Sequence, residues 1–306
     1  MEGLLERPEI LAVMSIGAAS LMLTLVYILK TLFPAAPRKV LPIEDFHRFE
    51  LVNKDRLSHD VCRFTFRLPA GHVLGLKTGQ HVSLKFVDPE TGKSVQRSYT
   101  PVTDDRTIGR FALVVKIYKP CEKFPAGGKM SQHLDSLEVG DFVYVKGPKG
   151  HMHYHHAGKF SVKPLGKKHE ERQAKQIGMM AGGTGITPML QILHKIFYID
   201  TDTSIIVKLL YANNTVDDIL VRQELDDLAA DFPDRFSVWY TVVDAPGDWK
   251  YDIGFIAPPM VKKHLLFDDQ TKATQFFMCG PPPMLKFASV PALEAAGYSA
   301  ADWVIF

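Results

Sequence analysis

Two short segments carry the residue types that bind nucleotides. Arg97 and Tyr99 lie two residues apart, so they share one face of a predicted strand. A guanidinium pairs with phosphate, and a phenol ring stacks on another ring. Further along, residues 182–188 read GGTGITP, a glycine turn leading into a predicted helix with Thr187 as N-cap and Pro188 as first residue. Together they predict two nucleotides on two domains, the layout of an enzyme that moves electrons from a nicotinamide to a flavin.

Two further motifs repeat this chemistry. Lys116 and Tyr118 form a second cation–phenol pair on a predicted strand. Residues 127–131, GGKMS, form a second glycine turn before a short helix predicted over residues 130–137, and such a turn can hold an anion. Each motif also has a plain interpretation. An exposed edge strand explains a cation and a phenol, and an ordinary loop can precede a helix.

Cysteine and histidine add two weaker signals. Cys279 lies at the carboxyl end of a predicted parallel strand, the edge where doubly wound sheets bind ligands. It could equally be a small buried apolar residue, and no His/Asp arrangement supports a nucleophile. The cluster His151, His153, His155 and His156 could bind a metal, but no acidic or cysteine partner lies nearby in the sequence. We expect a solvated loop there and no metal.

The pattern of elements predicts two domains after an N-terminal segment. Short alternating strands over residues 61–68, 81–86, 110–118 and 142–146 favour an antiparallel β-barrel. Strands over 177–181, 204–211, 236–243 and 275–279 then alternate with helices over 188–198 and 217–229, which indicates a doubly wound α/β domain with a parallel sheet. The predicted parts are a membrane anchor (1–33), a linker (34–48), the barrel domain (49–157), an irregular connector (158–175) and the α/β domain (176–306).

Composition limits the function classes. The net charge of +2 over 306 residues gives no field for nucleic acid, so no nucleic-acid partner is expected. The three cysteines, Cys62, Cys121 and Cys279, are sparse and far apart, which argues against a disulfide framework and for a reducing compartment.

The N-terminus predicts a transmembrane helix. An uncharged run begins at Ile10 and ends at Leu29, and its 20 residues would span roughly 30 Å, the thickness of a bilayer core. A signal peptide is the alternative, but the run is long and no basic region precedes it. Lys30, Arg38 and Lys39 flank its C-terminal side, so the large domain is expected in the cytosol.

Taken together, these motifs resemble the NADH–cytochrome b5 reductase family of the ferredoxin–NADP reductase superfamily, from about residue 49 to residue 306. The segments that carry the resemblance are RSYTPV (97–102), KIY (116–118), FPAGGKMS (124–131), AGGTGITPML (181–190) and MCGPPPM (278–284). One departure is Ser98, where many members have proline.

The resemblance implies a role for each matching residue. Arg97 would bind the FAD pyrophosphate, Tyr99 and Thr100 would contact the isoalloxazine, and His81 would hydrogen-bond toward Thr100. Phe306 would lie close to the flavin, and Asp244 would repel the 2′-phosphate of NADPH. The implied FAD set is Arg97, Ser98, Tyr99, Thr100, Val115, Lys116, Tyr118, Gly128, Lys129, Met130, Ser131 and Thr187; the NADH set is Gly182, Gly183, Thr184, Gly185, Asp244, Cys279, Gly280, Pro281 and Met284; the catalytic set is Thr100, Lys116, Cys279 and His81.

The resemblance also implies a partner. Electrons would pass from NADH to FAD and then singly to cytochrome b5, an acidic haem protein that Lys129, Lys167 and Lys168 would face. The implied location is the endoplasmic reticulum or the mitochondrial outer membrane. A reductase for another acceptor, such as a ferric chelate or a quinone, and a membrane-tethered redox sensor that binds NADH without turnover stay open.

Overall fold

The computed structural model describes residues 21–25, 27–28, 36–41, 43–122, 124–163, 168–200, 204–269 and 271–306. The chain divides into two units, Met1–Arg38 and Lys39–Phe306. In the first unit, residues 21–25 and 27–28 are helical with exposed side chains. Within the described ranges no helix has both the length and the apolar character to cross a membrane. Most of the expected anchor, residues 10–29, lies outside these ranges.

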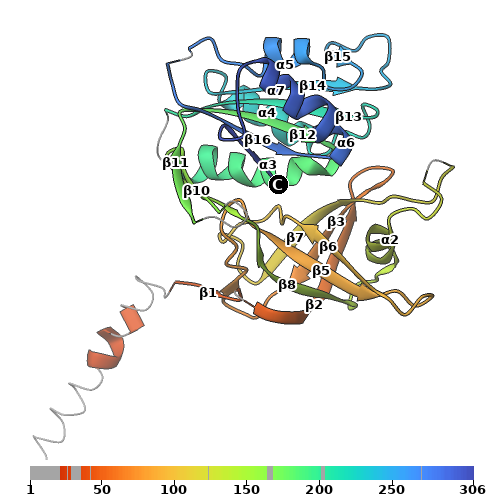
Figure 1. Cartoon of the computed structure of the whole chain (residues 1–306). Coiled ribbons are helices and arrows are strands. Elements are labelled where there is room, and N and C mark those ends of the chain that lie inside the picture. The colour runs from red at the N-terminus through yellow and green to blue at the C-terminus, as the bar shows by residue number, and fades with distance from the viewer. Residues whose placement is uncertain are drawn as a thin grey trace, which may run out of the picture. The chain divides into compact units, whose positions relative to one another are not determined.

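The first half of the larger unit is an antiparallel sheet that curls into a barrel, as predicted (Figure 1). The alternation in β3 (Val61–Arg67) buries Cys62, Phe64 and Phe66 completely and leaves the residues between them partly exposed. These side chains are the centre of an apolar core. The strand order is β6 (Ser94–Tyr99), β5 (His81–Val87), β8 (Phe142–Lys149), β2 (Ile43–Arg56), β3 and β7 (Arg110–Lys116).

The barrel begins before residue 49. Part of the stretch expected as linker forms β1 (Arg38–Lys39), which pairs with β4 (His72–Val73), and the start of β2. The Leu41 amide donates to the Leu74 carbonyl, and the Leu41 side chain is buried in the barrel core. The helix α2 (Lys129–Ser136) begins and ends one residue earlier than predicted. It packs on the same core through Met130 and Leu134.

The segment expected as an irregular connector forms strands instead. β9 (Met152–His156), β10 (Lys159–Val162) and β11 (Glu170–Gln173) form a small antiparallel sheet. Tyr154 and Phe160 are fully buried in it and join the core of the second half. No alternation marks these strands, because β10 has one exposed residue followed by three buried ones and β11 has no buried residue. Residues 164–167 lie outside the described ranges.

The second half is a parallel sheet, as predicted. Its strand order is β15 (Asp252–Ile253), β14 (Phe236–Val242), β13 (Ile206–Asn213), β12 (Gln176–Gly182), β16 (Thr274–Cys279) and β17 (Trp303–Ile305). β12 pairs with β13 on one side and β16 on the other, and each of its seven residues is buried. The order reverses around β12, which places a topological switch point at its carboxyl end.

Helices cover both faces of this sheet (Figure 1). α3 (Ile186–His194) and α4 (Arg222–Asp231) pack on the face that carries Met179 and Leu209. α5 (Pro258–His264) and α7 (Val290–Ala295) pack on the opposite face, against Met180. Short helical segments complete the half: η1 (Gly183–Gly185), η2 (Lys195–Ile199), α6 (Pro282–Met284) and η3 (Leu285–Ser289).

Two predicted helix boundaries are wrong. α4 begins at Arg222 rather than at Asp217, because residues 215–219 form turns closed by the Thr215 and Val216 carbonyls. α3 begins at Ile186, two residues earlier than expected, with Gly185 as N-cap and no side-chain cap. Thr187 therefore lies inside the first turn, where its hydroxyl donates to the Thr184 carbonyl at 3.2 Å.

Candidate functional site

One large cavity, about 1440 Å³, lies between the barrel and the α/β half and is lined by both. Ligand pockets of about 300–1,000 Å³ are usual for a single small ligand, so this cavity has room for two nucleotides side by side. Of the expected site residues, all but Asp244 line the cavity. The list is His81, Arg97, Ser98, Tyr99, Thr100, Val115, Lys116, Tyr118, Gly128, Lys129, Met130, Ser131, Gly182, Gly183, Thr184, Gly185, Thr187, Cys279, Gly280, Pro281, Met284 and Phe306.

The barrel wall presents a strand end with a cation and a phenol. Arg97 and Tyr99 lie on β6, with the Arg97 side chain exposed and its guanidinium donating to the Gln96 carbonyl at 2.7 Å. Tyr99 packs partly buried against the barrel core, and burial raises its pKa, so the phenol is neutral. The wall thus offers a cation next to a neutral ring, which suits a pyrophosphate attached to a flavin.

His81 lies next to this strand end. The β5–β6 register sets Val82 opposite Tyr99, which brings His81 level with Thr100 one position further on. Burial, followed by the nearby charges of His151 and Lys149, lowers the pKa of His81, so its imidazole is neutral near pH 7. A neutral imidazole can both donate and accept a hydrogen bond. The bond from His81 to Thr100 stays a prediction.

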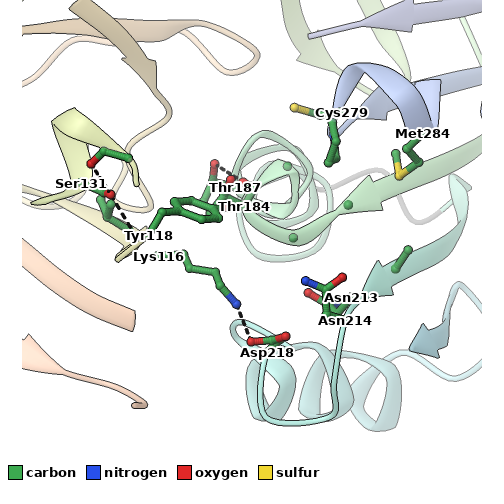
Figure 2. Close-up of a pocket in the computed structure, with 18 of the residues that line it drawn as sticks. Lys116, Tyr118, Ser131, Thr184, Thr187, Asn213, Asn214, Asp218, Cys279 and Met284 are labelled. Carbon is green, nitrogen blue, oxygen red and sulfur yellow. Dashed lines mark hydrogen bonds and ion pairs between the residues drawn. The ribbon is translucent and has the colours of Figure 1, made fainter. Parts of the chain in front are cut away.

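The glycine turn before α2 forms a second wall. Ser131 holds it together, because its hydroxyl donates to the Gly128 carbonyl at 2.9 Å and accepts from the Tyr118 amide at 3.1 Å (Figure 2). No side chain caps this helix start, where amides carry partial positive charge. β7 ends at Lys116, two residues earlier than predicted, so Tyr118 lies beyond the strand; it lines the cavity and is 41% exposed.

The glycines of the GGTGITP turn have two different tasks. Gly183 has a φ of +52° and open space where a side chain would begin, so a ligand can approach its backbone. A Cβ on Gly185 would lie 2.2 Å from the Cys279 carbonyl oxygen, and one on Gly182 would lie 2.6 Å from the Met284 sulfur. Close packing of the protein on itself therefore requires Gly185 and Gly182, and the approach of a phosphate fits Gly183.

Cys279 ends β16 beside the turn (Figure 2). Its sulfur lies 4.0 Å from the Phe306 carbonyl oxygen, and burial raises the pKa of the thiol to about 11. A thiol with that pKa is protonated at neutral pH, so Cys279 is a small neutral wall residue rather than a nucleophile.

Three cavity residues at the end of β13 and in the loop after it were not predicted. Asn213, Asn214 and Asp218 line the cavity from the α/β half (Figure 2). Asn213 is 8% exposed, and its side-chain amide has no hydrogen-bond partner among the described residues. A buried amide without a partner is costly unless a ligand or water supplies one. The signal was present, since two asparagines end a strand next to the switch point.

Two aromatic side chains were also missed. Phe255 and Phe287 line the cavity and are 77% and 70% exposed. Apolar rings exposed at the rim of a cavity are typical of a surface that a planar ligand covers. Neither belongs to a motif, so no pattern in the sequence points to them.

Lys116 is already paired within the protein. Its ammonium lies 2.9 Å from the Asp60 carboxylate and also contacts the Asp218 carboxylate (Figure 2). Burial alone would lower the pKa of Lys116, but the bonds to Asp218 and Asp60 outweigh it and raise the pKa. The charge of Lys116 is therefore already balanced by two carboxylates, and its place in the FAD and catalytic sets stays a prediction.

Asp244 does not line the cavity, whereas Lys129, one of the three docking lysines, does. The Asp244 amide donates to the Asn214 carbonyl at 2.8 Å, and its neighbour Val243 lines the cavity, so Asp244 stands at the rim. Lys129 is paired with Asp88 at 2.5 Å. Lys168 is exposed, and Lys167 lies outside the described residues.

Three of the four clustered histidines, His153, His155 and His156, belong to a strand and not to the loop that was expected. His153 and His155 lie on β9 with ring centroids 4.1 Å apart, and the His155 Nε2 is 3.1 Å from the Ser161 hydroxyl. Burial and the neighbouring His155 lower the pKa of His153 to about 4, so the ring is neutral near pH 7. Within the described ranges, the group with metal-ligand spacing is His59, Asp60 and Asp218, whose two carboxylates hold the Lys116 ammonium.

These residues fit the two nucleotides that the motifs predict. The barrel wall offers a cation, a ring and a helix start, and the α/β wall offers an open glycine, an unpartnered amide and exposed rings. The sites are separate in the sequence and continuous in space. Such an arrangement has room for two cofactors side by side between the domains.

Comparison with known proteins gives matches over both halves. Residues 48–154 match the family model described as "Oxidoreductase FAD-binding domain", and residues 179–289 match "Oxidoreductase NAD-binding domain". The chain is 46% identical over 252 residues to NADH-cytochrome b5 reductase 2 of Gallus gallus, covering 81% of each protein. It is 41% identical over 294 residues to NADH-cytochrome b5 reductase 2 of Xenopus tropicalis, covering 95% of each. The solved cytochrome b5 reductase domain of Ulva prolifera nitrate reductase matches with a TM-score of 0.80 and 43% identity, over 88% of this chain and 100% of that one.

Proposed function

This chain belongs to the NADH–cytochrome b5 reductase family, and we propose that it oxidises NADH in the interdomain cavity and passes the electrons through bound FAD to cytochrome b5. The observation that carries the proposal is the single cavity lined by both nucleotide motifs, Arg97 to Thr100 on the barrel and Gly182 to Gly185 on the α/β half. A cavity that served one nucleotide would not need both walls.

FAD, when bound, accepts a hydride from NADH and releases electrons one at a time, which is the chemistry that no side chain here supplies. The protein's part is position and environment. Arg97 and the amides at the start of α2 would hold the pyrophosphate of FAD, with the neutral Tyr99 ring beside the isoalloxazine. Neutral His81 would donate or accept a hydrogen bond at Thr100.

The α/β wall would hold NADH. Gly183 allows its pyrophosphate to approach the turn, and the Asn213 amide would gain a partner from the nucleotide. Protonated Cys279 and the Gly280 backbone would form the floor on which the nicotinamide rests. Holding two rings in one orientation is worth a large share of the barrier in such a transfer.

The acceptor and the location are finer proposals. The relatives' names support cytochrome b5 as acceptor. Lys168 is exposed and free to attract an acidic protein, whereas Lys129 shares its charge with Asp88. The uncharged run from Ile10 to Leu29 supports a membrane anchor with the catalytic part in the cytosol, on the endoplasmic reticulum or the mitochondrial outer membrane.

Absorbance of the purified full chain tests the core of the proposal. The protein should be yellow, bleach on addition of NADH without oxygen, and reduce ferricyanide through many turnovers. Bleaching without steady turnover would favour the redox-sensor alternative. Rates with cytochrome b5, a ferric chelate and a quinone then identify the acceptor, and the cytochrome b5 rate should fall as salt rises.

A matched pair of variants locates the flavin. Arg97→Met should lose most of its FAD, since Arg97 lines the cavity. Arg110→Met on β7 makes the same chemical change at an exposed residue and should keep its FAD. Equal flavin content in the two variants would remove Arg97 from the FAD site.

A further inference from the structure

Lys116 bridges the two halves of the larger unit. It is the last residue of β7 in the barrel, and Asp60 lies in the barrel turn between β2 and β3. Asp218 lies in the loop between β13 and α4 of the α/β half. The Lys116 ammonium contacts both carboxylates, at 2.9 Å in the case of Asp60. One of its two ion pairs therefore crosses the interface beside the cavity (Figure 2).

All three side chains are shielded from water. They are 13% (Lys116), 17% (Asp60) and 10% (Asp218) exposed. Ion pairs at this depth are screened little by salt, and removing one partner leaves the other charge without compensation. Loss of the Lys116–Asp218 pair should therefore change how the two halves pack at their interface.

The Asp218 carboxylate is held in place before it meets Lys116. One of its oxygens accepts from the Thr215 amide at 3.1 Å, and the other contacts Lys116. Burial alone would raise the pKa of Asp218, but the bonds from Lys116 and Thr215 lower it, so the carboxylate is ionised. The loop that carries Asp218 also carries Asn213 and Asn214 into the cavity.

The charges of the cluster argue against Lys116 as a phosphate ligand. Two carboxylates and one ammonium leave a net charge of −1, and two of the three groups line the cavity. A nucleotide phosphate would have to displace Asp218 from Lys116 and would then face that carboxylate. Repulsion between two anions in a shielded site is costly.

We propose that Asp218 is a positioning residue. Its ion pair with Lys116, called the strut below, sets the distance between the α/β residues that line the cavity and the barrel residues that line it, and so the distance between the nicotinamide and the flavin. The strut acts on the separation of the walls and leaves NADH affinity nearly unchanged. A second contact supports a fixed separation, since Gln191 of α3 accepts from the Gly79 amide of the barrel at 2.5 Å. The inference rests on the proposed transfer from NADH to FAD.

The test compares Asp218→Asn with Asp217→Asn. The two variants make the same charge change at adjacent residues, and Asp217 is exposed. In Asp218→Asn, the rate of flavin bleaching at saturating NADH should fall by tenfold or more, because a small displacement of reacting groups has a large effect on rate. The dissociation constant for NAD⁺ should change by less than about twofold, roughly 0.4 kcal/mol. Asp217→Asn should match the wild type in both.

Two results would overturn the proposal. Tighter NAD⁺ binding with an unchanged bleaching rate in Asp218→Asn would make Lys116 a nucleotide ligand that Asp218 restrains. Equal effects in the two variants would reduce Asp218 to a charge near the site. Wild-type protein that NADH does not bleach would instead contradict the proposed function itself.

A second variant covers loss of FAD or of folding in Asp218→Asn. Asp218→Glu keeps the ion pair but lengthens the strut by one methylene. Its bleaching rate should also fall, with NAD⁺ affinity kept. A wild-type rate in Asp218→Glu would show that charge, and not separation, is what matters.

Discussion

The ammonium of Lys129 lies 2.5 Å from the carboxylate of Asp88, which ties the first residue of α2 to the hairpin between β5 and β6. Asp88 also accepts from the Glu90 amide, so the hairpin turn and the helix start share one carboxylate. The helix start is the wall proposed to hold the FAD pyrophosphate. The geometry of that wall therefore depends on the charge of Asp88.

This dependence predicts an acid-sensitive FAD site. The hydrogen bond from Lys129 is the main cause that lowers the pKa of Asp88 to about 2, against about 3.9 for a free aspartate. Because the folded-state pKa is the lower one, the pair stabilises the fold fully above about pH 4, and this contribution is lost as the pH falls toward about 2. Asp88→Asn should bind FAD a few-fold more weakly at neutral pH and lose less on acidification.

Flavin fluorescence, which rises when FAD leaves the protein, measures both effects. Asp104→Asn is the control, since Asp104 also has a lowered pKa but is paired with Arg106 outside the cavity lining. The release of FAD from Asp104→Asn should depend on pH as it does in the wild type. If Asp88→Asn and Asp104→Asn coincide, the Lys129–Asp88 pair does not hold the FAD wall.

The cysteines predict an order of alkylation. With its pKa near 11, the Cys279 thiol is about 10⁻⁴ ionised at pH 7, against a few per cent for an ordinary thiol. Cys121 is exposed and should react at least tenfold faster, as peptide mapping by mass spectrometry would show. Bound NAD⁺ should slow the alkylation of Cys279 further and leave that of Cys121 unchanged.

Replacement of Cys279 checks its role as a floor for the nicotinamide. Cys279→Ser should keep the fold and the FAD but slow flavin reduction, because the nicotinamide would be placed less well. The control is Cys121→Ser, because Cys121 is exposed, and its flavin should be reduced at the wild-type rate. Cys62 is unsuitable as a control because it lies in the barrel core. Wild-type reduction rates in Cys279→Ser would leave it a packing residue.

Coenzyme choice is predicted to depend on Asp244. Asp244 lies at the cavity rim after β14, bonded to the Asn214 backbone, at the edge where an adenosine ribose is expected. A carboxylate there repels a 2′-phosphate. The wild type should have a much higher kcat/KM with NADH than with NADPH. Asp244→Thr should reduce this difference, mainly by raising kcat/KM with NADPH. The measurement is kcat/KM for both coenzymes, and a ratio that moves by less than about twofold, under ~0.5 kcal/mol, would leave Asp244 a turn residue.

The N-terminal limit of the catalytic part can be tested by truncation. A chain that begins at Ala36 keeps β1 and Leu41 and should reduce ferricyanide normally. A chain that begins at Ile43 loses the buried Leu41 side chain, so its free energy of unfolding should be about 2–3 kcal/mol lower. Urea denaturation of both measures the difference. Leu41→Ala in the longer chain should account for most of it, and equal stability would show that β1 and Leu41 are dispensable.

Local patterns predicted the two sheets well, because alternation and apolar runs reflect burial directly. The two glycine turns also line the cavity as expected, although in the GGTGITP turn only Gly183 is open to a ligand, and Gly182 and Gly185 are packed against other parts of the protein. What the sequence could not show is which charges neutralise one another. Lys116 and Asp218 are 102 residues apart, and their contact exists only once the two halves pack.

Helix starts and connectors were harder for a related reason. Pro188 and Thr187 suggested a helix start that the preceding turn shifts to Ile186. The strands β10 and β11 are short, and their stability comes from packing Phe160 into a core made by the α/β half. Such tertiary support leaves no local periodicity to detect.

The central place of β12 in its sheet has a consequence for how the protein loses its cofactors. An amide on a fully buried strand between two neighbours exchanges hydrogen with solvent only when the whole half unfolds, whereas a helix on the rim of a barrel can open by itself. The coenzyme turn at the end of β12 is then among the last parts to open, and α2 among the first. FAD should leave by local fluctuation from a protein whose C-terminal half is still native, and the emptied chain should take it up again without refolding.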